Sequence, residues 1–323
     1  MNRAVLQKCI VEARLLFAAC AIGLFAFCWV RIYIISRVDL ETFSQIVEKL
    51  WDKWADYWPV SLSQLLSYSG RIAVTFDEPI VVLCVSVFAI ARGSDVVSGE
   101  LNRGTMELLL AQPVSRWQVL LSQALVTVAG IVLLSLTAWL GTLAGIMTNT
   151  VQEEVPRPEL RIPGIGLSIP LSLKKPEKIR VPMGSKVEPQ NFIPGAVNLG
   201  ALGICLAGIS SLASAFDRYR WRTIGLVVGF YVVETILKIA GVAISEAAWL
   251  KKLSLFSAYE PQKFIATAVH DAANTWSLVL RDSQGTMLDV GPLGYNLILL
   301  GIGLGCYAAA AVVFQKRDLP APL

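Results

Sequence analysis

Histidine is almost absent from this chain, and charged residues are scarce. The 323 residues include one histidine, and 16% of them are charged, whereas charged residues make up about 25% of an ordinary soluble domain. A single histidine excludes a histidine-based metal centre within this chain and leaves little room for acid–base catalysis by imidazole. We therefore expect no metal site, no cofactor and no catalytic residue in this chain.

The common sequence motifs of nucleotide binding and hydrolysis are also missing. The chain has no GxxxxGK(S/T) phosphate loop, no GxSxG and no HExxH. Gly184-Ser185-Lys186 lacks the spacing of a phosphate loop, and the glycines from Gly301 to Gly305 lie inside an apolar run rather than after a strand. We therefore expect that the chain is not an enzyme and that another chain hydrolyses any ATP it depends on.

Cysteine motifs are not evident either. No CxxC occurs, and no cysteine lies in a long polar loop. We therefore expect the cysteines to be small packing residues between helices rather than disulfide partners or metal ligands. They are Cys9, Cys20, Cys28, Cys84, Cys205 and Cys306.

Hydrophobic residues, in contrast, are abundant. They make up 55% of the chain, which leaves too little polar surface for a soluble protein of this size. The formal net charge of +4 is too small to indicate a polyanionic partner, so we expect no nucleic-acid binding. This composition predicts a polytopic membrane protein.

Apolar runs that approach the length needed to cross a bilayer, about 20 residues, occur six times. The second run is the shortest, because Asp77 and Glu78 lie at its start. The first run continues ten residues past Cys20, so we expect an uncleaved helix rather than a signal peptide. The sequence therefore predicts an all-α membrane protein with six transmembrane helices. The runs are Leu15–Ile35, Phe76–Ala91, Trp117–Met147, Ala196–Phe216, Thr223–Ile244 and Leu293–Phe314.

The distribution of lysine and arginine predicts the orientation. Six helices place both termini on one side, where 53 residues carry 11 Lys/Arg, against 15 in 135 residues on the other side. The raw count favours the second side, but the density is about twice as high on the first, and positive residues favour the cytoplasm. We therefore expect a multi-pass protein of the inner or plasma membrane with both termini cytoplasmic. Residues 149–192 and 245–292 would then be extracytoplasmic.

The long loops on the far side have structure of their own. Residues 155–194 contain eight of the 15 prolines, which excludes a continuous helix and leaves Leu167–Leu173 and Lys178–Pro182 as short edge strands. Thr275–Leu280 and Thr286–Val290 flank a polar turn and predict a β-hairpin. The loops could contact an extracytoplasmic protein or cap a dimer.

Two further helices are predicted on this side. Pro261–His270 reads as a short helix. Glu41–Trp58 places aromatic and aliphatic residues on one helical face and charged residues on the other. This second segment suits either the headgroup region of the membrane or packing against the protein itself.

The polar segment between the second and third runs, residues 92–116, carries the most specific pattern. Thr105–Ala111 can form a short helix that ends before Pro113. It has leucines at 108–110 and charged residues around them. A short amphipathic helix between two membrane helices suits docking into a groove of a partner protein.

The order of residues in this segment resembles the first cytoplasmic loop of the ABC-2 type transporter permease family. That pattern is an acidic residue, then Gly-Thr-x-Glu-Leu-Leu, then Pro-Val-Ser-Arg and a helix, and all of it is present here. The N-terminal residues 1–14 resemble the family's interfacial elbow helix, and residues 314–318 resemble its usual ending. By this resemblance, residues 92–116 are a coupling loop whose docking residues are Glu100, Arg103, Gly104, Thr105, Glu107, Pro113 and Arg116. Alternatively, Gly104, Thr105 and Pro113 only shape a turn.

The resemblance implies that residues 1–323 form a single permease domain in the lipid bilayer. Its partners would be an ATP-binding cassette ATPase subunit and a second permease chain, identical or related, and the most direct function is export. Two alternatives stay open. One is ATPase-coupled mechanotransmission to an extracytoplasmic partner, and the other is a membrane enzyme or secondary transporter without an ATPase.

Two charged residues, Glu234 and Lys238, lie inside the fifth apolar run. Charges at membrane depth are costly and tend to mark a pathway or a buried pair. They form either a polar site that faces the translocation route or an ion pair between helices. Three GxxxG spacings, at 141/145, 225/229 and 301/305, permit close helix contact, but they do not assign a dimer face.

Overall fold

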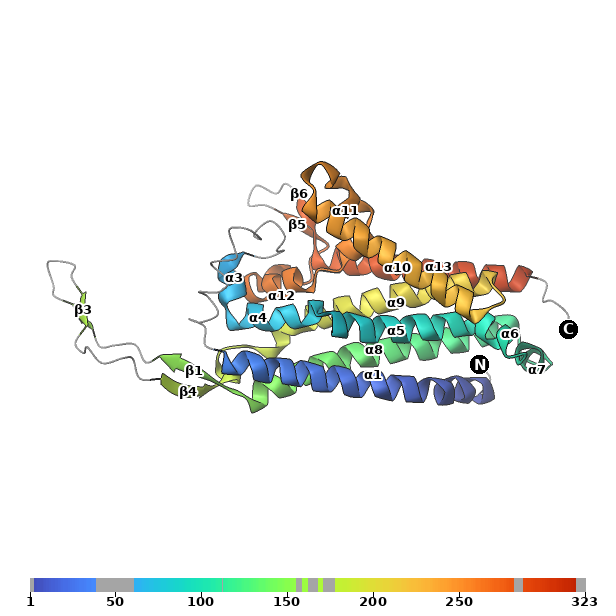
Figure 1. Ribbon diagram of the computed structural model, residues 1–323, viewed down its shortest axis with the longest axis horizontal. Helices are drawn as coiled ribbons and strands as arrows, with labels where there is room; N and C mark the ends of the chain where they lie inside the picture. The colour runs from blue at the N-terminus through green and yellow to red at the C-terminus, as the bar shows by residue number, and fades with distance from the viewer. Residues whose placement is uncertain are drawn as a thin grey trace.

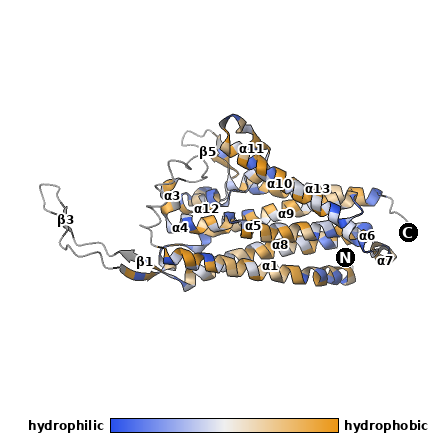
Figure 2. Ribbon diagram, viewed as in Figure 1, coloured by the Kyte–Doolittle hydropathy of each residue, from blue (hydrophilic) through white to orange (hydrophobic). Residues whose placement is uncertain are grey.

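The computed structural model describes residues 3–38, 61–111, 113–154, 159–161, 168–170, 178–281 and 287–317. In these ranges, six helical segments are long and apolar enough to cross a membrane. They lie side by side in one bundle, coloured largely as hydrophobic along their length (Figures 1 and 2). The predicted all-α polytopic fold is confirmed, whereas the predicted amphipathic segment 41–58 lies outside the described residues.

The long helices correspond to the six predicted runs. The second membrane-spanning segment is built from several pieces. It runs from Tyr68 to Asn102 and contains α5 together with shorter helical turns on either side. Its polar start is explained by Glu78, which is the N-cap of α5 and pairs with Arg31 of α1 at 2.9 Å. The long helices are α1 (Arg3–Arg37), α5 (Pro79–Ser94), α8 (Arg116–Thr148), α9 (Ile193–Phe216), α10 (Arg220–Ala243) and α13 (Pro292–Lys316).

The N-terminal segment does not form a separate elbow helix in this structure. Residues 3–14 are the first turns of α1, which runs without interruption to Arg37. The physical reason is that no proline or glycine occurs before Gly23, so nothing in the sequence breaks the helix. At 1.5 Å per residue, α1 is about 52 Å long and exceeds the hydrocarbon thickness of a bilayer.

Helix α9 forms the centre of the bundle. It is the most buried of the long helices and packs against α13, α5 and α8. The contact with α13 is close because two glycines face each other: a Cβ atom on Gly208 would lie 2.2 Å from the carbonyl oxygen of Gly303. In contrast, α1 and α10 expose large apolar side chains along their outer faces, such as Ile22 and Val233, as expected for helices that face lipid.

The three GxxxG spacings differ in what they contact. Gly141 and Gly145 of α8 pack tightly against α1, where an added Cβ would come within 2.8 Å of Phe25 and Ile32. The pairs 225/229 and 301/305 have no atom within 4 Å of an added Cβ. Among the described residues, only the first spacing therefore serves helix packing.

The start of α1 and the end of α13 lie at the same end of the bundle as residues 92–116 (Figure 1). We call this the loop end. An even number of crossings predicts this arrangement. The opposite end carries short helices and antiparallel strand pairs. The helices are α3 (Leu62–Leu66), α4 (Tyr68–Ala73), α11 (Trp249–Leu253) and α12 (Pro261–His270), with short 3-10 turns η2 (Val74–Asp77), η4 (Met183–Ser185), η5 (Pro189–Phe192), η6 (Ser245–Ala247), η7 (Leu255–Ala258) and η8 (Ala272–Asn274).

The predicted strand Lys178–Pro182 and the predicted hairpin in the last loop are both present, although the first hairpin strand begins at Val279 rather than at Thr275, and the sequence did not predict β1 and β2. The proline-rich region contains two antiparallel pairs, and the last loop contains one hairpin with a register irregularity after Leu280. The predicted helix 261–270 has the predicted bounds, with Pro261 in its first turn. The strands are β1 (Thr150–Glu154), β2 (Glu159–Arg161), β3 (Ser168–Pro170), β4 (Lys178–Pro182), β5 (Val279–Arg281) and β6 (Met287–Val290), paired β1–β4, β2–β3 and β5–β6.

Candidate functional site

The loop between α5 and α8 is a chain of short helical pieces. A π-turn, η3 (Asp95–Gly99), follows α5 directly and leads into α6 (Glu100–Asn102). Gly104 then adopts a φ of +69°, a left-handed conformation that only glycine takes without strain. The chain continues into α7 (Met106–Leu110), which confirms the predicted short helix. Ser115 accepts a hydrogen bond from the Gln118 amide and so begins α8.

Two features accompany the π-turn: a hydroxyl of α9 that accepts two of its amides, and a glycine that leaves room for a carboxylate. The amides of Val97 and Ser98 both donate to the hydroxyl of Ser214 on α9, at 3.1 and 2.9 Å. Gly99 leaves room for the Asp95 carboxylate, since a Cβ atom there would lie 2.1 Å from Asp95 Oδ1. A π-turn adds a residue to the turn, and it therefore rotates the residues that follow by about 100° relative to a regular helix.

Two carboxylates are buried at the base of the loop. Asp95 is 3% exposed and Glu100 is 0% exposed. Arg103 lies between them and donates to Asp95 at 2.7 Å and to Glu100 at 3.1 Å. Arg92 donates to Asp95 at 3.3 Å and to the side chain of Gln123 on α8 at 2.9 Å. Because buried charges are stable only when paired, this cluster fixes the loop base to the bundle.

The same carboxylates bind two further helices. Lys8 of α1 donates to both oxygens of Glu100, at 2.6 and 2.7 Å. Arg220, the first residue of α10, lies 3.5 Å from Asp95 and donates to the carbonyl of Ala91 at 3.2 Å. The loop base is thereby joined by ion pairs to α1 and α10, the two long helices with the least buried surface. We call Lys8, Asp95, Glu100, Arg103 and Arg220, together with Arg92, the loop-base cluster.

Arg103 lies beyond the end of α6, and its ionisation responds to this cluster. Burial lowers the pKa of a guanidinium, but the hydrogen bond and attraction from Asp95, together with the charge of Glu100, outweigh that effect and raise the pKa of Arg103 above its ordinary value. Arg103 therefore stays charged at any physiological pH.

One face of helix α7 packs against the helix bundle, and the other face is exposed. Met106 and Leu109 are buried, and Met106 packs in a cluster that includes Leu120 of α8 and Phe314 of α13. Glu107 and Leu108 point away, and Leu108 is 70% exposed. Helix α7 therefore presents a large apolar side chain beside a carboxylate on its exposed face.

The structure divides the predicted docking residues into two groups. Gly104, Glu107 and Pro113 are exposed. Glu100 is fully buried, and Thr105 donates its hydroxyl to the Glu100 carboxylate and its amide to the Glu100 carbonyl. The hydrogen bonds between Thr105 and Glu100 therefore stabilise the turn from its buried side.

Arg116 and Arg103 also act within the chain. Arg116 donates to the carbonyls of Phe314 and Arg317 at 3.0 and 2.7 Å, and so it caps the last turn of α13. Arg103 belongs to the loop-base cluster, although its side chain is 36% exposed. The exposed part of this loop thus contains fewer residues than the sequence motif.

The second predicted site, Glu234 and Lys238 on α10, does not form an ion pair between its two members. The Glu234 carboxylate accepts a hydrogen bond from the Leu255 amide at 2.7 Å. Lys238 donates to the carbonyls of Phe256 and Tyr259, both at 2.9 Å. The two charges therefore hold opposite ends of the short η7 segment, which folds back against α10.

A buried asparagine pair holds the same segment from the other side. The amide of Asn198 on α9 donates to Asn296 of α13 at 2.8 Å and to the carbonyl of Ala258 at 3.1 Å. Its oxygen accepts from the Glu260 amide at 3.1 Å. Side chains of α9 and α10 therefore satisfy main-chain groups at both ends of the irregular segment 255–260.

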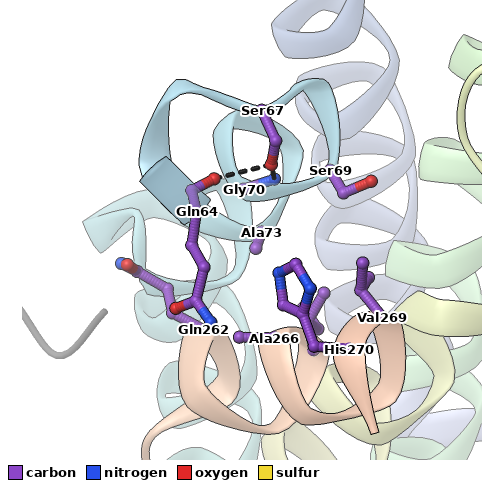
Figure 3. A pocket seen from close by; sticks show the side chains of 10 residues that line it. Gln64, Ser67, Ser69, Gly70, Ala73, Gln262, Ala266, Val269 and His270 are labelled. Atoms are coloured by element: carbon purple, nitrogen blue, oxygen red, sulfur yellow. Dashed lines mark hydrogen bonds between the residues drawn. The ribbon is translucent and has the colours of Figure 1, made fainter. Parts of the chain in front are cut away.

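The single histidine lies in a small polar depression at the opposite end. His270 faces α4 there, with Gln64, Ser67 and Gln262 around it (Figure 3). In the described part of the chain, no group of three or more His, Cys, Asp or Glu is placed to hold a metal ion. We assign no chemistry to this depression.

Several residues of the loop-base cluster are not recognisable as a site from sequence. Lys8, Asp95 and Arg220 are far apart or lie at helix ends, where charged residues are common. The signal that could have identified them is the placement of charges at the edges of apolar runs on one side of the membrane. Their pairing depends on the π-turn, which no pattern in the sequence predicts.

Comparison with known families identifies the chain. No curated protein matches the sequence closely enough to count as a relative. Residues 24–319 match the family described as ABC-2 family transporter protein, and this range includes the last part of α1, the other five apolar helices and the loop between α5 and α8. The chain therefore belongs to the ABC-2 family of transporter proteins.

Proposed function

We propose that the chain is the membrane subunit of an ATP-driven exporter and that the outer face of α7 docks an ATP-binding cassette ATPase subunit. The observation that carries this proposal is the division of α7: Met106 and Leu109 seat it on the bundle, while Glu107 and Leu108 point outward. A helix seated in this way transmits a push as a rigid body. The loop end would face the cytoplasm, where ATP is available.

The loop-base cluster supports the same proposal. A displacement of α7 reaches Glu100 through the short turn at Gly104, and Glu100 is bonded to Lys8 of α1. Asp95 is in turn paired with Arg220 of α10. These contacts give the docked ATPase a direct mechanical connection to the two long helices with the least buried surface. A second permease chain, identical or related, would complete the transport route.

The test is co-purification from native membranes. In tagged chain carrying Glu107→Arg, the reversed charge faces the partner, and a mismatched charge at a docking surface costs about 2–5 kcal/mol. We expect normal membrane abundance, loss of at least tenfold of the co-purifying cassette ATPase, and loss of transport. The ATPase is identified by mass spectrometry of the wild-type preparation.

The control is Thr150→Arg, which introduces an arginine at an exposed residue of the opposite end. This variant should retain the ATPase. If Glu107→Arg retains the same amount of ATPase and the same transport as Thr150→Arg, then α7 is not the docking surface. If no cassette ATPase accompanies even the wild type, the proposal of ATP coupling is wrong.

A further inference from the structure

The last turn of α13 carries a side chain on which the position of helix α7 depends. Phe314 is fully buried and belongs to the same apolar cluster as Met106 of α7, in which it is the largest side chain. Helix α7 has five residues, and a helix shorter than about 12 residues is marginal on its own in water. The position of α7 is therefore set by the cluster in which Met106 packs.

The last turn of α13 is held in place by an arginine of α8. The final carbonyl groups of a helix have no partner within the helix, and Arg116, the first residue of α8, supplies donors for three of them. Its guanidinium donates to the carbonyls of Phe314, Gln315 and Arg317 at 3.0, 3.3 and 2.7 Å. Its Cζ atom also lies 5.7 Å from the centroid of the Phe314 ring, within the range of a cation–π contact. Arg116 therefore binds both the main chain and the side chain of Phe314.

A second arginine attaches the same turn to α9. Arg317 directly follows α13, and its guanidinium donates to the carbonyls of Ala215 and Asp217 at 2.7 and 3.0 Å. Ala215 lies in the last turn of α9, and Asp217 is the residue that ends this helix. The carbonyl of Arg317 is in turn bound by Arg116. The start of α8 and the ends of α9 and α13 are therefore joined through two arginines.

These contacts favour a role inside the chain over direct contact with a partner. In both arginines a single terminal nitrogen, Nη1, donates to two or three main-chain carbonyls of this chain. The exposed face of α7, in contrast, presents Glu107 and Leu108. Arg116 and Arg317 can therefore affect a partner on that face through the position of α7.

We propose, on the basis of the docking function proposed for α7, that Arg116 and Arg317 are positioning residues for the interface with the ATPase. They hold the last turn of α13, and Phe314 with it, so that the apolar cluster fixes one orientation of α7. Loss of either arginine leaves carbonyl groups without donors at a helix end, and such ends fray. The ATPase then binds more weakly, although no residue of the exposed face has changed.

Hydrogen exchange of the purified full chain measures this positioning without any partner. In Arg317→Gln and in Arg116→Gln, the amides of residues 106–111 should exchange about tenfold faster, because hydrogen bonds from a charged group are lost. Exchange of residues 254–260, at the opposite end, should not change. Arg14→Gln is the matched control, because Arg14 is an exposed arginine of α1 at the same end of the bundle. Unchanged exchange of residues 106–111 in both variants would overturn the inference.

Titration with the cassette ATPase that co-purifies with the wild type separates positioning from a general loss of structure. With the full chain in lipid nanodiscs, Arg317→Gln should require about tenfold more ATPase for half-maximal stimulation of ATP hydrolysis and should reach the same maximum. A variant that is only unfolded in part would lower the maximum instead. Arg317→Lys, which keeps a cationic donor near the same carbonyls, should restore most of the affinity.

A double-mutant cycle tests whether Arg317 acts through the apolar cluster. Met106→Ala removes the side chain that packs in this cluster, so adding Arg317→Gln to it should weaken ATPase binding little further. Additive losses of affinity would contradict the proposed positioning role. If the wild type binds no cassette ATPase, the docking proposal is wrong, and the exchange of residues 106–111 still decides whether the two arginines position α7.

Discussion

The two ends of the bundle satisfy buried charges in different ways. At the loop end, Asp95 and Glu100 are paired with cationic side chains from separate helices, including Lys8 and Arg220. At the opposite end, Glu234 and Lys238 bind the main chain of a single short segment. Side-chain pairs between elements can break and re-form as the elements move, whereas charges that hold main-chain groups fix one conformation. The loop base is therefore held largely by ion pairs between separate helices, whereas the η7 segment is held by hydrogen bonds to its own main chain.

The largest expected effect comes from removing the charge at the centre of the loop-base cluster. Glu100→Gln leaves Lys8 and Arg103 without their carboxylate, and breaking a buried pair from one side costs about 3–5 kcal/mol. The free energy of unfolding of the purified chain should fall by that amount. Glu12→Gln is the control, because Glu12 also faces Lys8, at 3.6 Å, but is partly exposed. An equal loss of unfolding free energy in the two variants would contradict the stabilising role assigned to Glu100 in the loop-base cluster.

A smaller and more local effect is expected at the η7 segment. Lys238→Met removes two hydrogen bonds to main-chain carbonyls, and hydrogen bonds to charged groups contribute about 1.5–3 kcal/mol. Hydrogen exchange of the amides of residues 254–260 should become faster, while exchange in 92–116 stays unchanged. Lys252→Met, at an exposed neighbour, serves as the control. Faster exchange at the loop end would show that the two ends are not independent.

The π-turn gives a third way to separate the two ends. Gly99→Ala places a Cβ against the Asp95 carboxylate, and overpacking of this kind costs about 1–3 kcal/mol. We expect a lower melting temperature and a weaker ion pair between Asp95 and Arg103. Gly225→Ala, where an added Cβ meets nothing within 4 Å, should be neutral. A neutral Gly99→Ala would mean that Asp95 does not need its observed position.

The smallest effect is a pH dependence at the opposite end. Burial raises the pKa of Asp289, but hydrogen bonds from Lys263 and Tyr295 outweigh it and hold the pKa below its ordinary value. A lowered pKa contributes stability that is present above the ordinary carboxyl pKa and is lost as the pH falls through the lowered one. Because Asp289 is 38% exposed, the effect should stay below about 1 kcal/mol. Acid titration of stability should be slightly shallower in Asp289→Asn, and identical curves would contradict the pair.

Much of the fold follows from sequence because local rules and tertiary packing agree. Apolar length predicts the six membrane helices. Proline at the first turn predicts the start of α12, and the polar turn after β5 predicts the hairpin. At these positions no distant residue is needed to decide the outcome.

The candidate site was less predictable because its side-chain directions depend on distant contacts. The π-turn rotates Glu100 inward, and that turn exists because Ser214, more than a hundred residues away, accepts two amides. Glu234 and Lys238 have the favourable i, i+4 spacing of an ion pair, yet main-chain groups of η7 compete successfully for both. The sequence therefore identified Glu100, Glu234 and Lys238 as candidate residues but did not predict the groups that they bind.

The most direct test of the account is photo-crosslinking from α7 in native membranes. With p-benzoylphenylalanine in place of Leu108, which is 70% exposed, ultraviolet light should join the chain to a cassette ATPase, identified by mass spectrometry of the adduct. The same amino acid in place of Thr150, exposed at the opposite end, should give no such adduct. An ATPase adduct at 108 that disappears in the Glu107→Arg background is the predicted result. Absence of an ATPase adduct at 108 in membranes where the ATPase co-purifies with the chain would place the docking surface elsewhere and contradict the account.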